Sequence, residues 1–212
     1  MKPYPKIDTV YERDPDTNYS TLIPGDYARS EFKYLRYNDW ICTEKMDGTN
    51  IRVQWTSDGF TFKGRKDKSE IPPYLHESLR DIFEARESAM SEVFAGKEVC
   101  LYGEGVGHKI QKNGDRYYED GQTFILFDVW VDGWWLSWSA VCDVADKLAI
   151  QSAPYMGTMN LYEMVECVEK GNLVSRFGQF VPEGIVARPD QQLFFQNGDP
   201  IRTKIKHCDF EE

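Results

Sequence analysis

Alternating apolar and polar residues predict a strand and a hairpin in the first third of the chain. An apolar stretch at 41–44 runs directly into Lys45, and residues 51–55 alternate as a half-buried strand does. The turn residues Ser57-Asp58-Gly59 separate this strand from a second alternating stretch at 60–63. Two such stretches joined by a short turn predict a β-hairpin. The first forty residues mix Pro, Asp, Asn and Tyr with short apolar pieces, which predicts loops and short elements.

Apolar residues recur at helical spacing after Pro72-Pro73, and Gly96 follows them as a stop. This predicts a helix whose buried face consists of Leu75, Leu79, Ile82, Phe83, Met90, Val93 and Phe94. Two shorter helices are predicted at 141–148 and 161–169.

The remaining apolar stretches predict further strands, with Asp132-Gly133 and Asn197-Gly198 as turns between some of them. These strands are expected at 99–102, 124–131, 134–136, 184–187, 193–195 and 201–206. Together the elements predict an α+β fold of mainly antiparallel sheets flanked by helices.

Length and composition predict the size of the domain and the cellular location of the protein. The chain has 212 residues with 41% hydrophobic and 14% aromatic content, enough for one domain with a substantial core. No apolar stretch reaches transmembrane length, so no membrane partner is expected. The five cysteines include no C-x-x-C pair, which predicts free thiols rather than a zinc site or disulfides. We therefore expect a soluble, cytoplasmic protein.

Acidic residues outnumber basic ones by 35 to 25, giving a net charge of −10. Proteins that coat nucleic acid are usually basic, so this balance argues against that class. It leaves room for an enzyme with a local basic groove, because net charge does not decide the chemistry of one site.

The segment from Glu44 to Asn50 is the strongest candidate for chemistry. Lys45 ends a predicted strand and precedes a turn at Asp47-Gly48. This places the amine of Lys45 where the strand leaves the sheet. Alone, the pattern is also that of a solvated lysine beside a turn. Other segments follow it in a fixed order: Gly64-Arg65, Leu101–Gly105, Ile125–Val129, Pro182–Ala187 and Thr203–Lys206.

This ordered series resembles motifs I, Ia, III, IIIa, IV and V of the covalent nucleotidyltransferase superfamily of polynucleotide ligases and mRNA capping enzymes. The E-K-x-D-G-T-N form of the first segment is most similar to the RNA ligase family. The resemblance implies an adenylyltransferase (ATP-grasp-like ligase) domain. Few residues flank the series, so we expect a single nucleotidyltransferase domain over 1–212, with no OB-fold and no C-terminal accessory domain.

The resemblance implies an ATP-dependent RNA ligase that joins 3′-OH and 5′-phosphate ends through lysyl-AMP and adenylylated RNA. RNA ends, in a nicked duplex or a single strand, are the expected partners, with a possible accessory protein. RNA repair in a phage or bacterium is expected by analogy only. The alternatives are a DNA ligase, a capping-type guanylyltransferase that uses GTP, and a non-catalytic domain that binds RNA ends.

Catalysis is assigned by the resemblance to Lys45, Glu183, Lys204 and Lys206. It assigns nucleotide binding to Glu44, Asn50, Arg65, Glu104, Phe127 and Val186, and a divalent cation, Mg²⁺ or Mn²⁺, to Asp47, Glu104 and Glu183. Residues two apart on a strand share a face, so Lys204 and Lys206 can both reach phosphates. They would also, with the metal, favour the neutral amine that Lys45 needs for attack. Carboxylate oxygens are ligands that Mg²⁺ prefers.

The finer roles also come from the resemblance. Phe127 and Val186 would cover the two faces of adenine, while Glu44 and its backbone would contact the adenine amino edge. Arg65 would contact the ribose or the incoming phosphate, and Asn50 would orient the metal shell or a phosphate.

Several of these residues also have an ordinary structural explanation. A core position is the commoner fate for an aromatic such as Phe127. Glu183-Gly184 is also typical of a turn before a strand. Lys204 and Lys206 are also typical of the solvent face of an edge strand.

Overall fold

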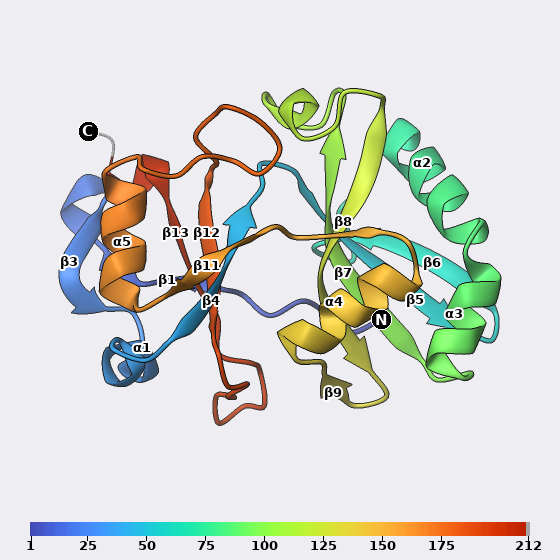
Figure 1. The fold of residues 1–212 in the computed structure, drawn as a ribbon, viewed down its shortest axis with the longest axis horizontal. Coiled ribbons are helices and arrows are strands. Elements are labelled where there is room, and N and C mark those ends of the chain that lie inside the picture. Colours follow the sequence, from blue (N-terminus) through green and yellow to red (C-terminus); the bar gives the residue numbers. More distant parts are fainter. Residues whose placement is uncertain (211–212) are drawn as a thin grey trace. The chain divides into compact units, whose positions relative to one another are not determined.

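The computed structural model describes residues 1–210, and the chain divides into two compact units. Unit 1 comprises Met1–Tyr4 and Asp47–Ala153, and unit 2 comprises Pro5–Met46 and Pro154–Glu212. Each unit contains a mainly antiparallel sheet with helices packed on it (Figure 1), which confirms the predicted α+β class. The assignment of the whole chain to one nucleotidyltransferase domain stays a prediction.

The sheet of unit 1 has the strand order β10-β8-β7-β5-β6, with β9 paired to β8. Only β8 and β10 pair in parallel among these strands as described. The strands are β5 (Thr49–Thr56), β6 (Gly59–Gly64), β7 (Val99–Gly107), β8 (Gln122–Val131), β9 (Trp134–Trp135) and β10 (Gln151–Ser152). The predicted hairpin at 51–63 is therefore confirmed.

Helices α2 (Pro73–Glu84), α3 (Glu87–Phe94) and α4 (Trp138–Lys147) pack on one face of this sheet (Figure 1). A 3₁₀ turn, η2, covers Gly114–Arg116. The prediction of one helix through 75–94 was wrong, because the chain breaks between α2 and α3. The Arg86 guanidinium donates to the carbonyl oxygens of Ile82, Leu148 and Ala149, which fixes the break. The apolar residues of α2 and α3 pack on the same face of the sheet. Their spacing therefore continues across the break and did not reveal it.

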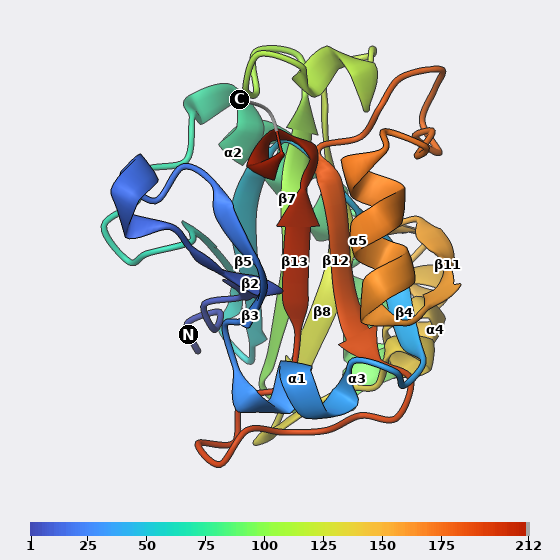
Figure 2. The same cartoon turned by 90° about the vertical axis from the view of Figure 1, so that its left-hand side faces the viewer.

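Unit 2 has the strand order β1-β13-β12-β4-β11, in which only β1 and β13 pair in parallel among the described strands. These are β1 (Asp8–Thr9), β4 (Trp40–Lys45), β11 (Tyr155–Met159), β12 (Gly184–Pro189) and β13 (Thr203–Lys206). Helix α5 (Leu161–Glu169) covers one face (Figure 2), where Met164 and Val168 pack with Ile185 and Ile205. The bounds of α5 match the predicted helix at 161–169, because Asn160 and Glu163 form a capping box.

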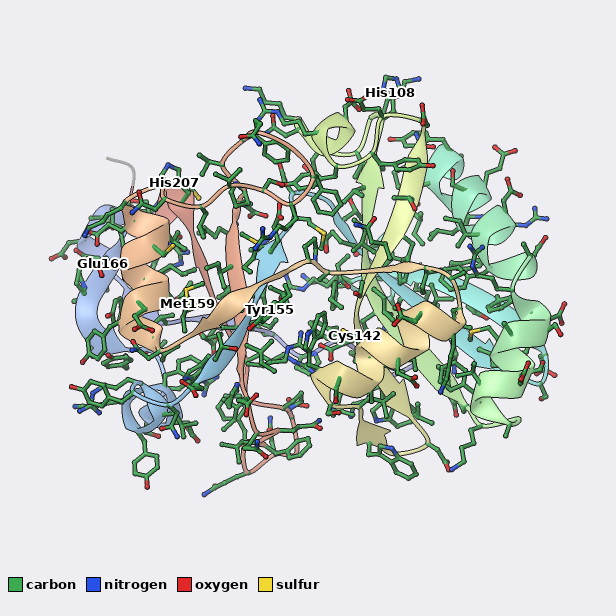
Figure 3. The ribbon with its side chains drawn as sticks, in the orientation of Figure 1. His108, Cys142, Tyr155, Met159, Glu166 and His207 are labelled. Carbon is green, nitrogen blue, oxygen red and sulfur yellow. The ribbon has the colours of Figure 1, made fainter. Side chains whose placement is uncertain are left out.

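The beginning of unit 2 forms a two-stranded ribbon of β2 (Tyr11–Arg13) and β3 (Leu22–Tyr27), with a 3₁₀ turn η1 (Pro15–Thr17) between them and helix α1 (Ser30–Leu35) after it. A further 3₁₀ turn, η3 (His207–Asp209), follows β13. His207 lies at the end of α5 (Figure 3), with its Nδ1 3.2 Å from the Val168 carbonyl oxygen.

The strand predicted at 193–195 was wrong. The segment contributes only an isolated bridge, between Phe194 and Pro200, and then turns at Asn197-Gly198. The turn closes on itself through a bond from the Phe195 amide to the Asp199 carbonyl oxygen, which leaves too few residues for a ladder.

Within residues 1–210, no helix is both long and apolar enough to cross a membrane.

Candidate functional site

Three neighbouring strands of unit 2 bring together Lys45, Glu183 and Lys206. Gly184 pairs with Lys45 on β4 and with Lys206 on β13, so Glu183 enters the sheet between the two lysines. The Lys45 Nζ lies 2.5 Å from Glu183 Oε2, and the Lys206 Nζ lies 2.8 Å from Glu183 Oε1. One carboxylate therefore holds two ammonium groups, one on each oxygen. We call these three residues the charge cluster.

Gly184 makes this arrangement possible. A Cβ atom at this position would lie 2.0 Å from the Ile205 carbonyl oxygen and 2.8 Å from the Lys206 Cα. Real Cβ atoms do not approach backbone so closely, so β12 can lie against β13 here only with glycine. Gly184 is thus the first residue of β12, and Glu183 directly precedes the strand.

Opposing effects set the charges in the cluster. Burial alone raises the pKa of Glu183, but the charges of Lys45 and Lys206 outweigh it and hold that pKa below its usual value. Burial alone lowers the pKa of Lys206, whereas its bond to Glu183 raises it, and the net shift is upward. Glu183 and Lys206 are therefore both charged at neutral pH.

Lys204 and Val186 lie on the same sheet face as the charge cluster. They pair with each other across β13 and β12, two residues from the pair of Lys206 and Gly184. Strand alternation therefore points all of these side chains to one side. We expected cations next to Lys45 from the sequence. The structure places the Glu183 carboxylate beside Lys45, and Lys206 binds the other oxygen of that carboxylate.

Glu44 lies on the opposite face from Lys45 because consecutive strand residues alternate. Its side chain is buried, and its carboxylate accepts hydrogen bonds from the Ser175 hydroxyl at 2.6 Å and the Arg176 amide at 2.8 Å. Burial raises the pKa of Glu44, although these two bonds oppose the shift. The carboxylate therefore ties the segment around residue 175 to β4. The predicted contact of Glu44 with adenine stays a prediction.

In unit 1, Asn50 and Glu104 pair directly across β5 and β7. The turn that carries Asp47 packs onto this pair, since a Cβ on Gly48 would lie 2.7 Å from Glu104 Cγ and 2.5 Å from the Gly105 carbonyl oxygen. The Asn50 Oδ1 is buried and makes no hydrogen bond. A buried amide oxygen without a hydrogen bond is stabilised when it binds a hydrogen-bond donor or a cation.

The oxygen atoms of unit 1 fit a hard divalent cation. Asp47, Asn50 and Glu104 all carry side-chain oxygen, the ligand that Mg²⁺ and Mn²⁺ accept, and Asn50, whose Oδ1 has no hydrogen bond, pairs with Glu104 across the two strands. Across residues 1–210, no group of three or more His, Cys, Asp and Glu side chains could hold a metal ion.

Phe127 occupies a β-bulge. Tyr102 pairs with Asp128 and Gly103 pairs with Leu126, so Phe127 is the extra residue on β8. Its ring is half-buried and meets Tyr4 edge-on, with centroids 5.2 Å apart. Tyr4 is in turn anchored by its hydroxyl, which donates to Asp128 Oδ2 at 2.6 Å. The first residues of the chain thus orient Phe127.

Arg65 is exposed and follows Gly64 at the end of β6. A second arginine, Arg52, is fully buried and holds this segment in place. Its Nε donates to the Gly64 carbonyl oxygen and its Nη2 to Asp67 Oδ1, each at 2.8 Å. That bond and the Arg52 charge lower the pKa of Asp67. Arg52 therefore positions the chain on both sides of Arg65.

Sequence reasoning missed Tyr4, Arg52 and Ser175, which position the candidate residues. Arg52 stands at a polar position of an alternating strand, where exposure is the expected outcome. Tyr4 and Ser175 lie far along the chain from the residues that they support, and no local pattern marks them.

Comparison with known proteins agrees with the ordered segments. The family model for RNA ligase matches residues 38–206. A structure of a Naegleria gruberi RNA ligase mutant with AMP and Mn has a TM-score of 0.63 and 17% identity over 96% of this chain and 57% of that one. A structure of Naegleria gruberi RNA ligase with PPi has a TM-score of 0.63 and 17% identity, covering 97% and 60%.

This chain thus spans less than two thirds of the length of those Naegleria chains. No curated protein matches it. At 17% identity the structural likeness establishes the fold alone. The family match is different, because it runs through most of the chain and contains every ordered segment from Lys45 to Lys206. The chain belongs to the RNA ligase family.

Proposed function

We propose that this protein is an ATP-dependent RNA ligase in which Lys45 takes AMP from ATP. The observation that carries the proposal is the charge cluster, which sets an amine beside a carboxylate and a second ammonium group on three adjacent strands. Membership of the RNA ligase family supports the substrate class. The similar Naegleria gruberi structures contain ATP or AMP with Mn, which supports the nucleotide and the metal.

In the first step the lone pair of the Lys45 Nζ attacks the α-phosphorus of ATP. A phosphorus–nitrogen bond forms, the bond to the bridging oxygen breaks, and pyrophosphate leaves with that electron pair. Glu183 Oε2, 2.5 Å from the Nζ, is placed to accept the proton that the amine must lose. Lys204 and Lys206 stabilise the negative charge that develops on the phosphoryl oxygens.

Two further transfers complete the reaction. The 5′-phosphate of RNA attacks the AMP on Lys45, which frees the lysine and gives adenylylated RNA. The 3′-OH of the other end then attacks that phosphate, a phosphodiester forms, and AMP leaves. A role in RNA repair would follow from this activity.

For unit 1 we propose the roles that the family implies. Asp47 and Glu104 would hold Mg²⁺ or Mn²⁺ through water, with Asn50 orienting that shell. In unit 2, Glu183 would contact a metal through water. Such a metal would neutralise phosphate charge. Phe127 and Val186 would cover adenine, and Arg65 would contact the ribose or a phosphate. Glu44 and its backbone would contact the adenine amino edge.

Incubation with α-labelled ATP and a divalent metal, followed by intact mass measurement, tests the proposal. The unchanged protein should gain one AMP, and Lys45→Ala should gain none. The matched control is Lys147→Ala, because Lys147 is an exposed lysine paired with Asp143, and this variant should label normally. Lys45→Ala should still seal RNA that is already adenylylated, since Lys45 acts only before that step.

Other outcomes would replace the proposal. Transfer of GMP instead of AMP would indicate a guanylyltransferase. Sealing of DNA ends in preference to RNA ends would indicate a DNA ligase. No adduct with either nucleotide, in Mg²⁺ or Mn²⁺, would leave a domain that binds RNA ends without chemistry.

A further inference from the structure

Arg52 is a fully buried arginine of unit 1 that lies next to the segment carrying Arg65. It stands on β5 between β6 and β7 (Figure 1), where it pairs with Lys63 on one side and with Tyr102 on the other. Its exposed fraction is 0%. Burial of a charged guanidinium costs free energy unless its N–H groups are bonded. Packing alone therefore does not account for an arginine at this position.

The guanidinium of Arg52 bonds to the chain before and after Arg65. Nε donates to the Gly64 carbonyl oxygen and Nη2 donates to Asp67 Oδ1, each at 2.8 Å. Arginine presents its N–H groups as a rigid planar fork, whereas the ammonium of a lysine would not fix two acceptors in this way. Nη1 has no hydrogen bond within residues 1–210, so the arrangement is not the one that best satisfies a buried charge.

Residues 64–69 form a compact loop, which we call the Arg65 loop. The Ser69 amide donates to the Lys66 carbonyl oxygen at 2.9 Å, and the Lys66 amide donates to the Ser69 hydroxyl at 3.3 Å. A Cβ on Gly64 would lie 2.9 Å from the Ser69 Cβ, so the two ends of the loop are in contact. The Arg65 side chain is exposed, so its position depends mainly on the backbone of the loop.

The charges around the Arg65 loop are unequal. The segment 63–69 contains one carboxylate, Asp67, and four cations, Lys63, Arg65, Lys66 and Lys68. Within residues 1–210, the ion pairs of Asp67 are with Arg52 at 2.8 Å and with Lys63 at 3.9 Å. The bond from Arg52 and its charge lower the pKa of Asp67, which is therefore ionised at neutral pH. The carboxylate is thus held by Arg52 rather than by Arg65.

The ion pair between Arg52 and Asp67 is a weak source of stability. The Asp67 side chain is 65% exposed, so water screens its charge, and the removal of Arg52 from water opposes the pairing. Apolar residues of similar volume often replace buried ionic groups without loss of stability. What the pair contributes is therefore the position of the loop more than the free energy of unfolding.

We propose that Arg52 is a positioning residue for Arg65 in the ligation reaction. Its fork fixes the backbone on either side of Arg65 and so directs that exposed guanidinium toward its ligand. The link to the reaction rests on the proposed function, which assigns to Arg65 a contact with the ribose or a phosphate. The fixing of the loop by Arg52 does not depend on that assignment.

Digestion of the folded full chain with trypsin tests the fixing of the loop without any reaction. Trypsin cuts after lysine and arginine, and the loop offers Arg65, Lys66 and Lys68. Arg52→Met keeps an apolar side chain of similar length but removes the fork. Cleavage in the loop should therefore become about tenfold faster or more, relative to the same bonds in the unfolded chain. Cleavage after Lys112, in another loop of unit 1, should keep its rate.

The matched control is Arg86→Met. Arg86 is another guanidinium of unit 1 that fixes backbone, at the break between α2 and α3. This variant should leave cleavage in the Arg65 loop unchanged. Asp67→Asn removes the exposed partner of Arg52 and should also raise cleavage in the loop. No rise in either Arg52→Met or Asp67→Asn, or an equal rise in Arg86→Met, would overturn the proposal.

A double-mutant cycle then links the loop to the reaction. Arg52→Met and Arg65→Ala should slow the same step, either AMP labelling or transfer of AMP to RNA, by about tenfold or more. The double variant should be no slower than Arg65→Ala alone, because Arg52 acts only through Arg65. Normal rates in Arg52→Met, or effects that multiply in the double variant, would overturn the role of Arg52 in positioning Arg65.

The two experiments separate this proposal from the proposed function. If the unchanged protein takes no AMP from ATP, the proposed function fails, and the digestion still decides whether Arg52 fixes the loop. If the protein takes AMP normally and Arg52→Met shows neither faster cleavage nor a slower step, only the role of Arg52 fails.

Discussion

The two units present their candidate residues on sheets of similar construction, but they fix those residues by different forces. In unit 2, Lys45, Glu183 and Lys206 hold one another by ion pairs. In unit 1, Phe127 is held by a bulge and by the ring of Tyr4. Charged bonds respond to pH and to the loss of one charge, whereas aromatic contacts respond to shape. The chemistry and the recognition of the nucleotide should therefore fail in different ways.

Glu183→Gln should have the largest effect in the comparison, because it removes the negative charge that the two lysines of the cluster share. We expect AMP labelling to slow by about 100-fold or more, as when one electrostatic partner of a transition state is lost. The rate of labelling at saturating ATP measures this. Glu166→Gln, which removes an exposed carboxylate paired with Lys170, should label at the normal rate.

The same variant also has a pH signature. The pKa of Glu183 is lowered in the folded state, so its ion pairs stabilise the fold above the usual carboxyl pKa and are lost as pH falls through the lowered value. Urea unfolding from pH 7 to pH 3 should therefore show the unchanged protein converging on Glu183→Gln in acid. A difference in free energy that is independent of pH would contradict this account.

Phe127→Ala should have an intermediate effect, confined to nucleotide affinity. Loss of a stacking surface costs about 1–3 kcal/mol per base, so the KM for ATP should rise about tenfold while kcat changes little. Phe127→Tyr keeps the ring and should restore the affinity. An unchanged KM in Phe127→Ala would return this residue to an ordinary packing role beside Tyr4.

Ser175→Ala should have the smallest effect, and it should appear in stability more than in rate. It removes one of the two bonds that satisfy the buried Glu44 carboxylate, so we expect a loss of about 1–3 kcal/mol in the free energy of unfolding. AMP labelling should slow only a few-fold. Ser20→Ala removes an exposed hydroxyl and should change stability by less than about 0.5 kcal/mol.

Much of the fold follows from the sequence because its strands alternate clearly. The hairpin at 51–63 and the helix at 161–169 are marked by local signals, namely a turn and a capping box. Two features escaped prediction. The break at Arg86 is fixed by carbonyl oxygens of Leu148 and Ala149, which lie some sixty residues away. Strand β11 (Tyr155–Met159) is short, and its pairing with β4 shifts register between Tyr155 and Gly157, so no regular alternation marks it.

The sequence names the candidate residues more readily than it places them. The ordered segments identify Lys45, Glu183 and Lys206, but not that Glu183 lies between the two lysines. Nor does the pattern around Glu44 show that its carboxylate is already bonded to Ser175. Strand pairing between distant segments determines these ion-pair and hydrogen-bond partners. A local sequence pattern contains no information on that pairing.

The order of strands also decides when the charge cluster can exist during protein synthesis. All but four residues of unit 1 form one continuous stretch, so its sheet can close as soon as that stretch has emerged from the ribosome. Lys45 emerges earlier, but its partner Glu183 lies 138 residues later and Lys206 follows after that. In a nascent chain, Lys45 therefore lacks these two partners until translation has nearly passed β13, and only then does the chain acquire the arrangement proposed to react with ATP.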